Sequence, residues 1–304
     1  MVRRVASYAL EPLLQGQETS TLLLGRLNAR AVSSERYRSI QQAEFKVYSQ
    51  WGEDGIIQYL IHKVPIADQS FIEFGVESYA ESNTRFLLVN DNWRGLVIDG
   101  GSRHVKFTEQ RQLRWRHSLD AKTAFVTREN VNSLFEEAGF TGDLGLLSID
   151  IDGNDYWVWE AVHVVNPRIV VVEYNATFGA NLAVSVPYDP QFQRTQAHSS
   201  TLYWGVSLAA LCHLGRKKGY RFVGSNSAGN NAFFVREDIA GDLPALSAQD
   251  GYMEARFRES RNADGQLTYL TARRDRLLAI ADQNVVDVVS GELVSIRTHF
   301  AAEL

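Results

Sequence analysis

The sequence contains a single cysteine, Cys212, among its 304 residues. One thiol excludes an internal disulfide framework and any zinc site built on several thiolates. Such low cysteine usage is typical of a reducing compartment. We therefore expect the protein to be cytoplasmic.

Basic residues and long apolar runs are also scarce. The chain has 31 Lys and Arg against 36 Asp and Glu, a formal net charge of −5, so it lacks an overall positive field for nucleic acid or anionic lipid. The leucines of residues 1–27 are interrupted by Glu, Pro, Gln and Gly well before membrane-spanning length. We expect no nucleic-acid partner, no membrane partner and no signal peptide.

No internal repeat, low-complexity tract or linker rich in Pro, Gly and Ser divides the chain. We predict one main α/β domain over residues 47–240. A helical extension over 1–46 precedes it, and a mainly helical extension over 241–304 follows, with 267–289 as its longest helical stretch. The helices of the two extensions are candidates for contacts between copies in a homo-oligomer.

Short apolar runs alternate with helical patterns from residue 70 onward. The predicted strands are 70–76, 93–100, 123–127, 144–152 and 167–175, and the predicted helices are 84–92, 127–140 and 207–219. The fourth and fifth runs are nearly continuous, as expected of parallel strands buried on both faces. Two further runs, 220–226 and 231–237, are separated by "SAGN" and predict a closing β-hairpin.

The first two predicted strands end in residues suited to a nucleoside. Glu73 and Gly75 close "FIEFGV", and an acid followed by a glycine and a helix is typical of the first step of a nucleotide-cofactor site. A dinucleotide fingerprint requires three glycines, so the lone Gly75 disfavours NAD. Asp99 ends the second strand, where a carboxylate can accept hydrogen bonds from both ribose hydroxyls. These residues predict a nucleoside site without a phosphate cradle, which suits S-adenosylmethionine.

The order of "SQWGEDGI", "FIEFGV", "GLVIDG", "LLSIDIDGNDYWVW", "VVVEYN" and the closing hairpin resembles that of a class I S-adenosylmethionine-dependent methyltransferase. In more detail it is similar to the FkbM-like group and its bacterial relatives. The resemblance covers about residues 47–236. It implies a Rossmann-like α/β fold: a seven-stranded, mostly parallel sheet with an antiparallel last strand and helices on both faces.

The resemblance also implies roles for individual residues. Glu73 and Gly75 would line the methionine and adenosine end of the cofactor, Asp99 would hold the ribose, and Asp150 would face the sulfonium and the substrate. We add Ser148, two residues before Asp150, to the cofactor-binding set. The sequence departs from the usual family pattern after Gly75, where "VESYAES" replaces further glycines.

Residues 48–61, "YSQWGEDGIIQYLI", precede the first strand and combine polar residues with a helical apolar stripe. One interpretation is that this segment folds over the cofactor and that Gln50 contributes a polar side chain. The alternative is a capped surface helix, since acidic residues are common at helix starts.

Two pairs of polar residues end the fourth and fifth strands. Asp150 and Asp152 are two positions apart, as are Glu173 and Asn175, so on extended backbone each pair projects from one face. Four such oxygen ligands suit a hard cation such as Mg²⁺, Ca²⁺ or Mn²⁺. The resemblance extends to this point, because some class I O-methyltransferases have acidic and amide ligands at these two strand ends.

The same cluster has a structural interpretation. Asp152, Gly153 and Asn154 are ordinary turn residues, and Asp155 can cap a helix that begins near Tyr156. The spacing leaves both interpretations open, because it does not fix the number of ligands.

His198 lies in the loop 178–200, where a substrate lid is expected, and is therefore a candidate general base. A solvated loop histidine is the alternative. The same loop is expected to govern the choice of substrate.

The leading hypothesis is transfer of a methyl group to a small polar metabolite or sugar-like acceptor, with oxygen favoured over nitrogen as the acceptor atom. Asp150 would position or deprotonate the acceptor, with or without a divalent metal. Two alternatives stay open. Asp150 and Asp152 form a D-x-D, which a metal-dependent glycosyltransferase uses with a nucleotide sugar. The incomplete glycine loop also fits a non-catalytic module that keeps the fold.

Overall fold

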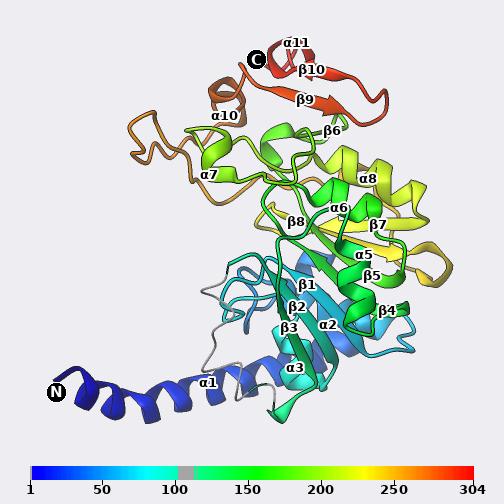
Figure 1. Cartoon of the computed structure of the whole chain (residues 1–304). Coiled ribbons are helices and arrows are strands. Elements are labelled where there is room, and N and C mark those ends of the chain that lie inside the picture. The colour runs from blue at the N-terminus through cyan, green and yellow to red at the C-terminus, as the bar shows by residue number, and fades with distance from the viewer. Residues whose placement is uncertain (1, 102–112, 114) are drawn as a thin grey trace.

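The computed structural model describes residues 2–101, 113 and 115–304 of the chain. Its centre is a seven-stranded sheet in the order β3-β2-β1-β4-β5-β8-β7 (Figure 1). The strands are β1 (Ser70–Phe74), β2 (Arg94–Asp99), β3 (Leu119–Thr123), β4 (Gly142–Ile149), β5 (Val165–Glu173), β7 (Tyr220–Ser225) and β8 (Asn231–Arg236). β8 pairs antiparallel with both β5 and β7, and the other pairs are parallel. The predicted Rossmann-like fold class is confirmed.

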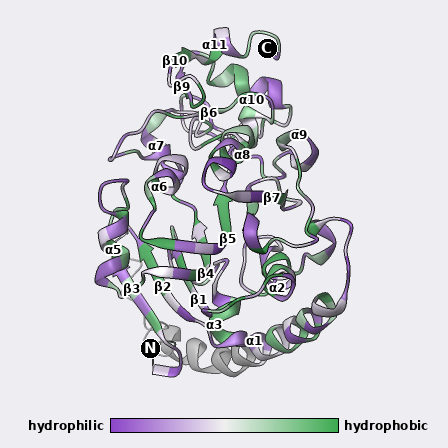
Figure 2. Cartoon of the chain, turned by 90° about the vertical axis from the view of Figure 1, so that its right-hand side faces the viewer, coloured by the Kyte–Doolittle hydropathy of each residue, from purple (hydrophilic) through white to green (hydrophobic). Residues whose placement is uncertain are grey.

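Helices cover both faces of this sheet. Helices α5 (Val131–Glu137), α6 (Asp155–Ala161) and α8 (Leu208–Lys217) pack on one face, and α2 (Glu53–Lys63) and α3 (Arg85–Asp91) on the other. Helix α1 (Val2–Ser34) packs against α2. Strand β5 shows why its sequence is a continuous apolar run. Val170 and Val172 face the first layer, while Ile169 and Val171 face the second. The central strands are accordingly green in Figure 2.

Local sequence signals explain several element ends. The Ser207 side chain accepts a hydrogen bond from the backbone N–H of Ala210 and caps α8. The predicted hairpin between β7 and β8 is present, and Asn226 organises its turn. The Asn226 side-chain oxygen accepts hydrogen bonds from the N–H groups of Gly229, Asn230 and Asn231, each at 3.1 Å.

The third strand lies four residues before its predicted position. β3 is Leu119–Thr123, paired with β2 from Gly95 to Asp99, whereas the apolar run at 123–127 was predicted to form it. As an edge strand β3 is only partly buried, so its sequence has no continuous apolar signal. The apolar residues Ala124, Phe125 and Val126 follow the strand and line a cavity instead.

The prediction of one long helical stretch at 267–289 is wrong. Helix α10 covers only Arg273–Ala279, and the chain then forms β9 (Asn284–Asp287) and β10 (Leu293–Ser295). These two strands make a three-stranded sheet with β6 (Val184–Ser185). β-branched residues such as Val285 and Val286 favour strands once a pairing partner is present. The mainly helical character expected of 241–304 is therefore wrong as well.

The remaining elements are short. They are η1 (Ile40–Ala43), η2 (Ala176–Phe178), α7 (Arg194–Ala197), η3 (Glu237–Ile239), α9 (Ala248–Gly251) and α11 (Ile296–His299). Among the described residues, no helix combines the length and the apolar character that crossing a membrane requires.

Candidate active site

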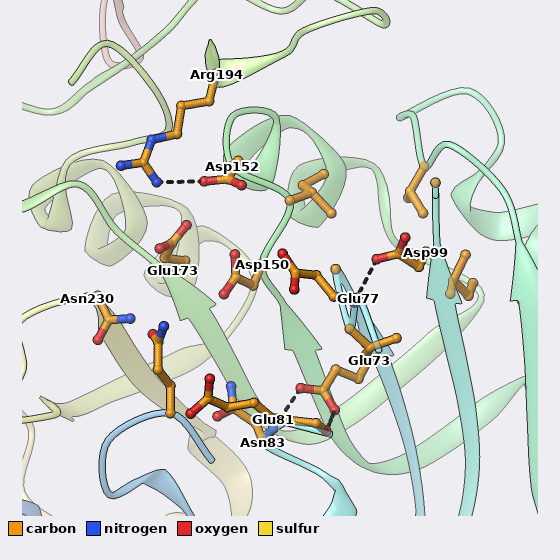
Figure 3. Close-up of a pocket in the computed structure, with 18 of the residues that line it drawn as sticks. Glu73, Glu77, Glu81, Asn83, Asp99, Asp150, Asp152, Glu173, Arg194 and Asn230 are labelled. Carbon is orange, nitrogen blue, oxygen red and sulfur yellow. Dashed lines mark hydrogen bonds and ion pairs between the residues drawn. The ribbon is translucent and has the colours of Figure 1, made fainter. Parts of the chain in front are cut away.

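A cavity of about 760 Å³ opens at the carboxyl ends of the central strands (Figure 3). It lies where the strand order reverses, between β1 and β4, which is the position at which doubly wound α/β sheets bind ligands. Seven of the ten predicted site residues line it: Gln50, Glu73, Gly75, Asp99, Asp150, Asp152 and Glu173. The sheet thus brings most of the predicted residues together.

The lining of this cavity is strongly acidic. Its carboxylates are Glu73, Glu77, Glu81, Asp99, Asp150, Asp152, Glu173 and Glu259. Arg194 is the only Lys or Arg among the described residues that line it. Such a surface repels anionic ligands and attracts cationic ones.

The carboxylate of Glu73 forms hydrogen bonds with other groups of the protein. Its carboxylate is buried and accepts hydrogen bonds from the side chains of Ser82 and Thr84 and from the backbone N–H groups of Asn83 and Thr84. Burial raises its pKa, and these hydrogen bonds act in the opposite direction. Glu73 therefore fixes the loop at 82–84 that forms one wall of the cavity.

Gly75 is required by packing between strands. Its φ of +70° is unfavourable for residues with a Cβ. A Cβ built on it would lie 1.6 Å from the Asp150 carbonyl oxygen. The glycine lets the ends of β1 and β4 approach each other, independently of any ligand.

Asp99 organises the loops beside it and keeps capacity for a ligand. Its Oδ2 accepts a hydrogen bond from the Glu77 N–H at 2.8 Å, and its Oδ1 accepts one from the Gly101 N–H at 2.7 Å. Each carboxylate oxygen has two lone pairs, so with the donors that the described residues provide, one remains on each for ligand hydroxyls. Phe125 lies on the same side of the cavity, with 47% of its surface exposed.

Asp150 and Glu173 form an acidic pair at the ends of β4 and β5, and they lie next to each other in Figure 3. Burial raises the pKa of both groups well above the usual value, and the charges of Asp152 and Asp155 raise both further. The charge of Asp150 also raises the pKa of Glu173, whereas the interaction with Glu173 lowers the pKa of Asp150. The two carboxyls therefore bind protons as a pair and not independently.

The predicted metal set is not assembled. Asp152 points to the exposed rim, where its Oδ1 accepts a hydrogen bond from Arg194 at 3.0 Å. Asn175 is fully buried outside the cavity lining. Its amide nitrogen donates to the carbonyls of Leu202 and Trp204, and its oxygen accepts from the Thr177 N–H. Among the described residues, no three His, Cys, Asp or Glu side chains are grouped to hold a metal ion.

Asp155 shapes the loop that carries Asp152. Its carboxylate is buried and accepts hydrogen bonds from the N–H groups of Ile151 and Gly153. Burial raises its pKa to about 7, against the effect of these hydrogen bonds. The interpretation of Asp155 as a helix cap is wrong in detail, because α6 begins at Asp155 itself and Asn154 occupies the N-cap position. Asp155 instead stabilises the turn before α6.

Ser148 and His198 do not line the cavity. The Ser148 hydroxyl is buried beneath it and accepts a hydrogen bond from the Asn83 amide at 3.1 Å. His198 is partly buried, hydrogen-bonded to the Ser200 hydroxyl at 2.8 Å and 3.7 Å from the Asp282 carboxylate. His198 is thus outside the cavity lining, and its role as general base stays a prediction.

The start of α2 is buried, which contradicts the surface-helix alternative. Glu53 accepts hydrogen bonds from the N–H groups of Trp51 and Gly52 and from the side chain of Asn231. These bonds attach the segment to the β7–β8 hairpin and place Gln50 in the cavity lining.

Sequence reasoning missed Arg194 and Phe125 as lining residues. Arg194 lies over the Trp204 ring, donates to the Thr201 carbonyl, and pairs with Asp152. Its position in the loop 178–200 was the available signal. Phe125 was assigned to a strand, and only the register of β3 places it at the cavity.

No protein-family model matches the chain, and no curated protein does. Two similar solved structures are methyltransferases. One is the O-methyltransferase from Bacillus cereus in complex with SAH, with 15% identity and a TM-score of 0.38 over 71% of this chain and 89% of that one. The other is the CurJ carbon methyltransferase, with 11% identity and a TM-score of 0.39 over 62% and 56%. TM-scores this low establish no shared activity, and the fold assignment rests on the strand order alone.

Proposed function

We propose that the protein transfers a methyl group from S-adenosylmethionine to a small polar acceptor, with a hydroxyl as the favoured acceptor group. The observation that carries this proposal is the position of Asp99. It ends β2 beside an exposed aromatic ring, in an acidic cavity at the point where the strand order reverses. A cavity of about 760 Å³ is also within the size range of small-molecule sites.

The residues that line the cavity fit S-adenosylmethionine. The free lone pairs of Asp99 suit the two ribose hydroxyls, and Phe125 offers a face on which a base can stack. The acidic lining favours a sulfonium cation, and with Arg194 as the one basic residue among the described lining residues it disfavours the phosphates of a dinucleotide. When bound, S-adenosylmethionine supplies an activated methyl group, so the protein has to bind, align and deprotonate the acceptor.

Asp150 is the residue we assign to the acceptor proton. It is half-buried and lines the cavity together with Glu173. Its raised pKa makes its carboxylate a stronger base than that of an exposed aspartate. Asp150 can thus take a proton from an acceptor hydroxyl.

The two alternatives differ from this proposal in what they bind. A glycosyltransferase would hold a nucleotide diphosphate, which the acidic lining repels, and Asp152 of the D-x-D is paired with Arg194. A non-catalytic module would leave the cavity without a nucleoside ligand.

Calorimetric titration of the purified chain with S-adenosylmethionine and S-adenosylhomocysteine, each with and without Mg²⁺, tests the proposal. We expect binding of both ligands without a requirement for Mg²⁺. Asp99→Ala should weaken both, whereas Asp150→Ala should leave binding intact and abolish transfer of labelled methyl groups. Absence of binding by the unmodified chain, or binding of a nucleotide diphosphate instead, would overturn the proposal.

A further inference from the structure

Glu173 is a buried carboxylate, and none of the described residues donates a hydrogen bond to its Oε2. Its surface is only 7% exposed, yet it lines the cavity. Within the described part of the chain, its Oε2 accepts no hydrogen bond. Its close neighbour is the carboxyl of Asp150, another acid. A buried carboxylate without donors is costly, so this position is suited to a ligand that brings them.

The surroundings of Glu173 supply little compensating charge. The acids that act on it are Asp150, Asp152 and Asp155, and the cation that acts on it is Arg194. That arginine already pairs with Asp152 at 3.0 Å and lies 3.6 Å from Glu259. Figure 3 shows its guanidinium directed at Asp152, above Glu173. The part of the cavity around Glu173 and Asp150 therefore keeps an excess of negative charge.

Building on the proposed methyl transfer, we propose that the acceptor substrate is a small hydrophilic amino alcohol. Its protonated ammonium group binds between Glu173 and Asp150, and its hydroxyl group accepts the methyl group. An ammonium group supplies three N–H donors and a positive charge. It would give Oε2 of Glu173 the donor it lacks and offset the charge of the pair. A neutral polyol would supply donors but leave the charge uncompensated.

Other cations fit this position less well. A divalent metal would need a third ligand, and the described residues offer no group of three. The amino group of S-adenosylmethionine is a competing occupant, and it would make Glu173 a cofactor-binding residue instead. S-adenosylhomocysteine carries the same amino group. The two assignments therefore differ in whether substitution of Glu173 lowers the affinity for S-adenosylhomocysteine.

The experiment compares matched amines and alcohols. Two pairs are titrated calorimetrically: glucosamine with glucose, and ethanolamine with ethylene glycol. Each compound is titrated into the free protein and into the protein saturated with S-adenosylhomocysteine. We expect at least one amine to bind about tenfold or more tightly than its hydroxyl counterpart, since a hydrogen bond to a charged group carries that much discrimination. Glu173→Gln should remove this preference and leave S-adenosylhomocysteine affinity unchanged.

A charge-matched control is Glu292→Gln. Glu292 is exposed in the turn between β9 and β10, outside the cavity lining, and its substitution should preserve the amine preference. The inference is wrong if no amine binds more tightly than its counterpart, or if Glu173→Gln keeps the preference. Loss of S-adenosylhomocysteine binding in Glu173→Gln would make Glu173 a cofactor-binding residue and would also overturn the inference. If the unmodified chain does not bind S-adenosylhomocysteine, the proposed function is refuted. This outcome is separate from a failure of the amine inference, because the amines are also titrated into the chain without S-adenosylhomocysteine.

Discussion

Two glutamates end neighbouring regions of the sheet, Glu73 on β1 and Glu173 on β5, with 4% and 7% of their surfaces exposed. Both line the same cavity, and burial raises the pKa of both. Glu73 accepts hydrogen bonds from three consecutive residues, 82–84, whereas Oε2 of Glu173 accepts none within the described residues.

The difference separates a structural acid from one that is available to a ligand. Residue type, burial and position at a strand end are the same in the two cases. The number of donors that the protein supplies decides the role, because an acid with all its donors present has nothing to gain from a ligand. An acid held without donors lowers stability and is typical of functional sites.

The largest expected effect is at Glu73. Glu73→Ala should lower the free energy of unfolding by about 3–5 kcal/mol, since it leaves the donors of residues 82–84 buried without an acceptor. Urea denaturation of the variant and the unmodified chain measures this. As a comparison, Glu81→Ala removes an exposed acid and should cost less than about 1 kcal/mol. Equal losses in the two variants would refute the structural role of Glu73.

Asp54, at the start of α2, is intermediate between the two glutamates. Its Oδ2 accepts three backbone N–H groups, from Val47, Tyr48 and Ser49, whereas its Oδ1 has no partner among the described residues. Burial raises its pKa from 3.8 to about 6. Between pH 3.8 and 6 the folded state therefore keeps a proton that the unfolded state releases, so the stability that this group contributes falls as pH rises, by up to about 3 kcal/mol.

Asp54→Asn tests this pH dependence. The asparagine oxygen can accept the same three N–H groups, and its NH₂ takes the place of the unpartnered Oδ1. We expect the variant to gain stability relative to the unmodified chain as pH rises from about 4 to 6, measured by denaturation at each pH. A stability difference that stays constant over this window would contradict the prediction.

The smallest expected effect is at Glu173, and it has the opposite sign. Glu173→Gln should raise the free energy of unfolding by about 1 kcal/mol, since it removes the repulsion of Asp150, Asp152 and Asp155 from a buried charge. The same denaturation assay, in the absence of ligand, measures it. A loss of more than about 1 kcal/mol would show that Glu173, like Glu73, has a structural role.

Part of the site could be predicted because it depends on the carboxyl ends of parallel strands. Strands β1, β2, β4 and β5 are continuous apolar runs, and the polar residues after such runs meet at one edge of the sheet. For this reason Asp99, Asp150 and Glu173 line the same cavity. The same rule could not separate Glu73 from Glu173, because the donors to Glu73 come from a loop.

The sequence by itself determined the order of strands and helices and the edge at which the acids gather, because hydrophobic periodicity and strand-end residues are local properties. Only the tertiary structure decided the register of β3, the strands β9 and β10, and the inward burial of Asn175, because each depends on partners distant along the chain. The position of His198 outside the cavity lining has the same origin, since loop packing fixes which side chains reach the cavity.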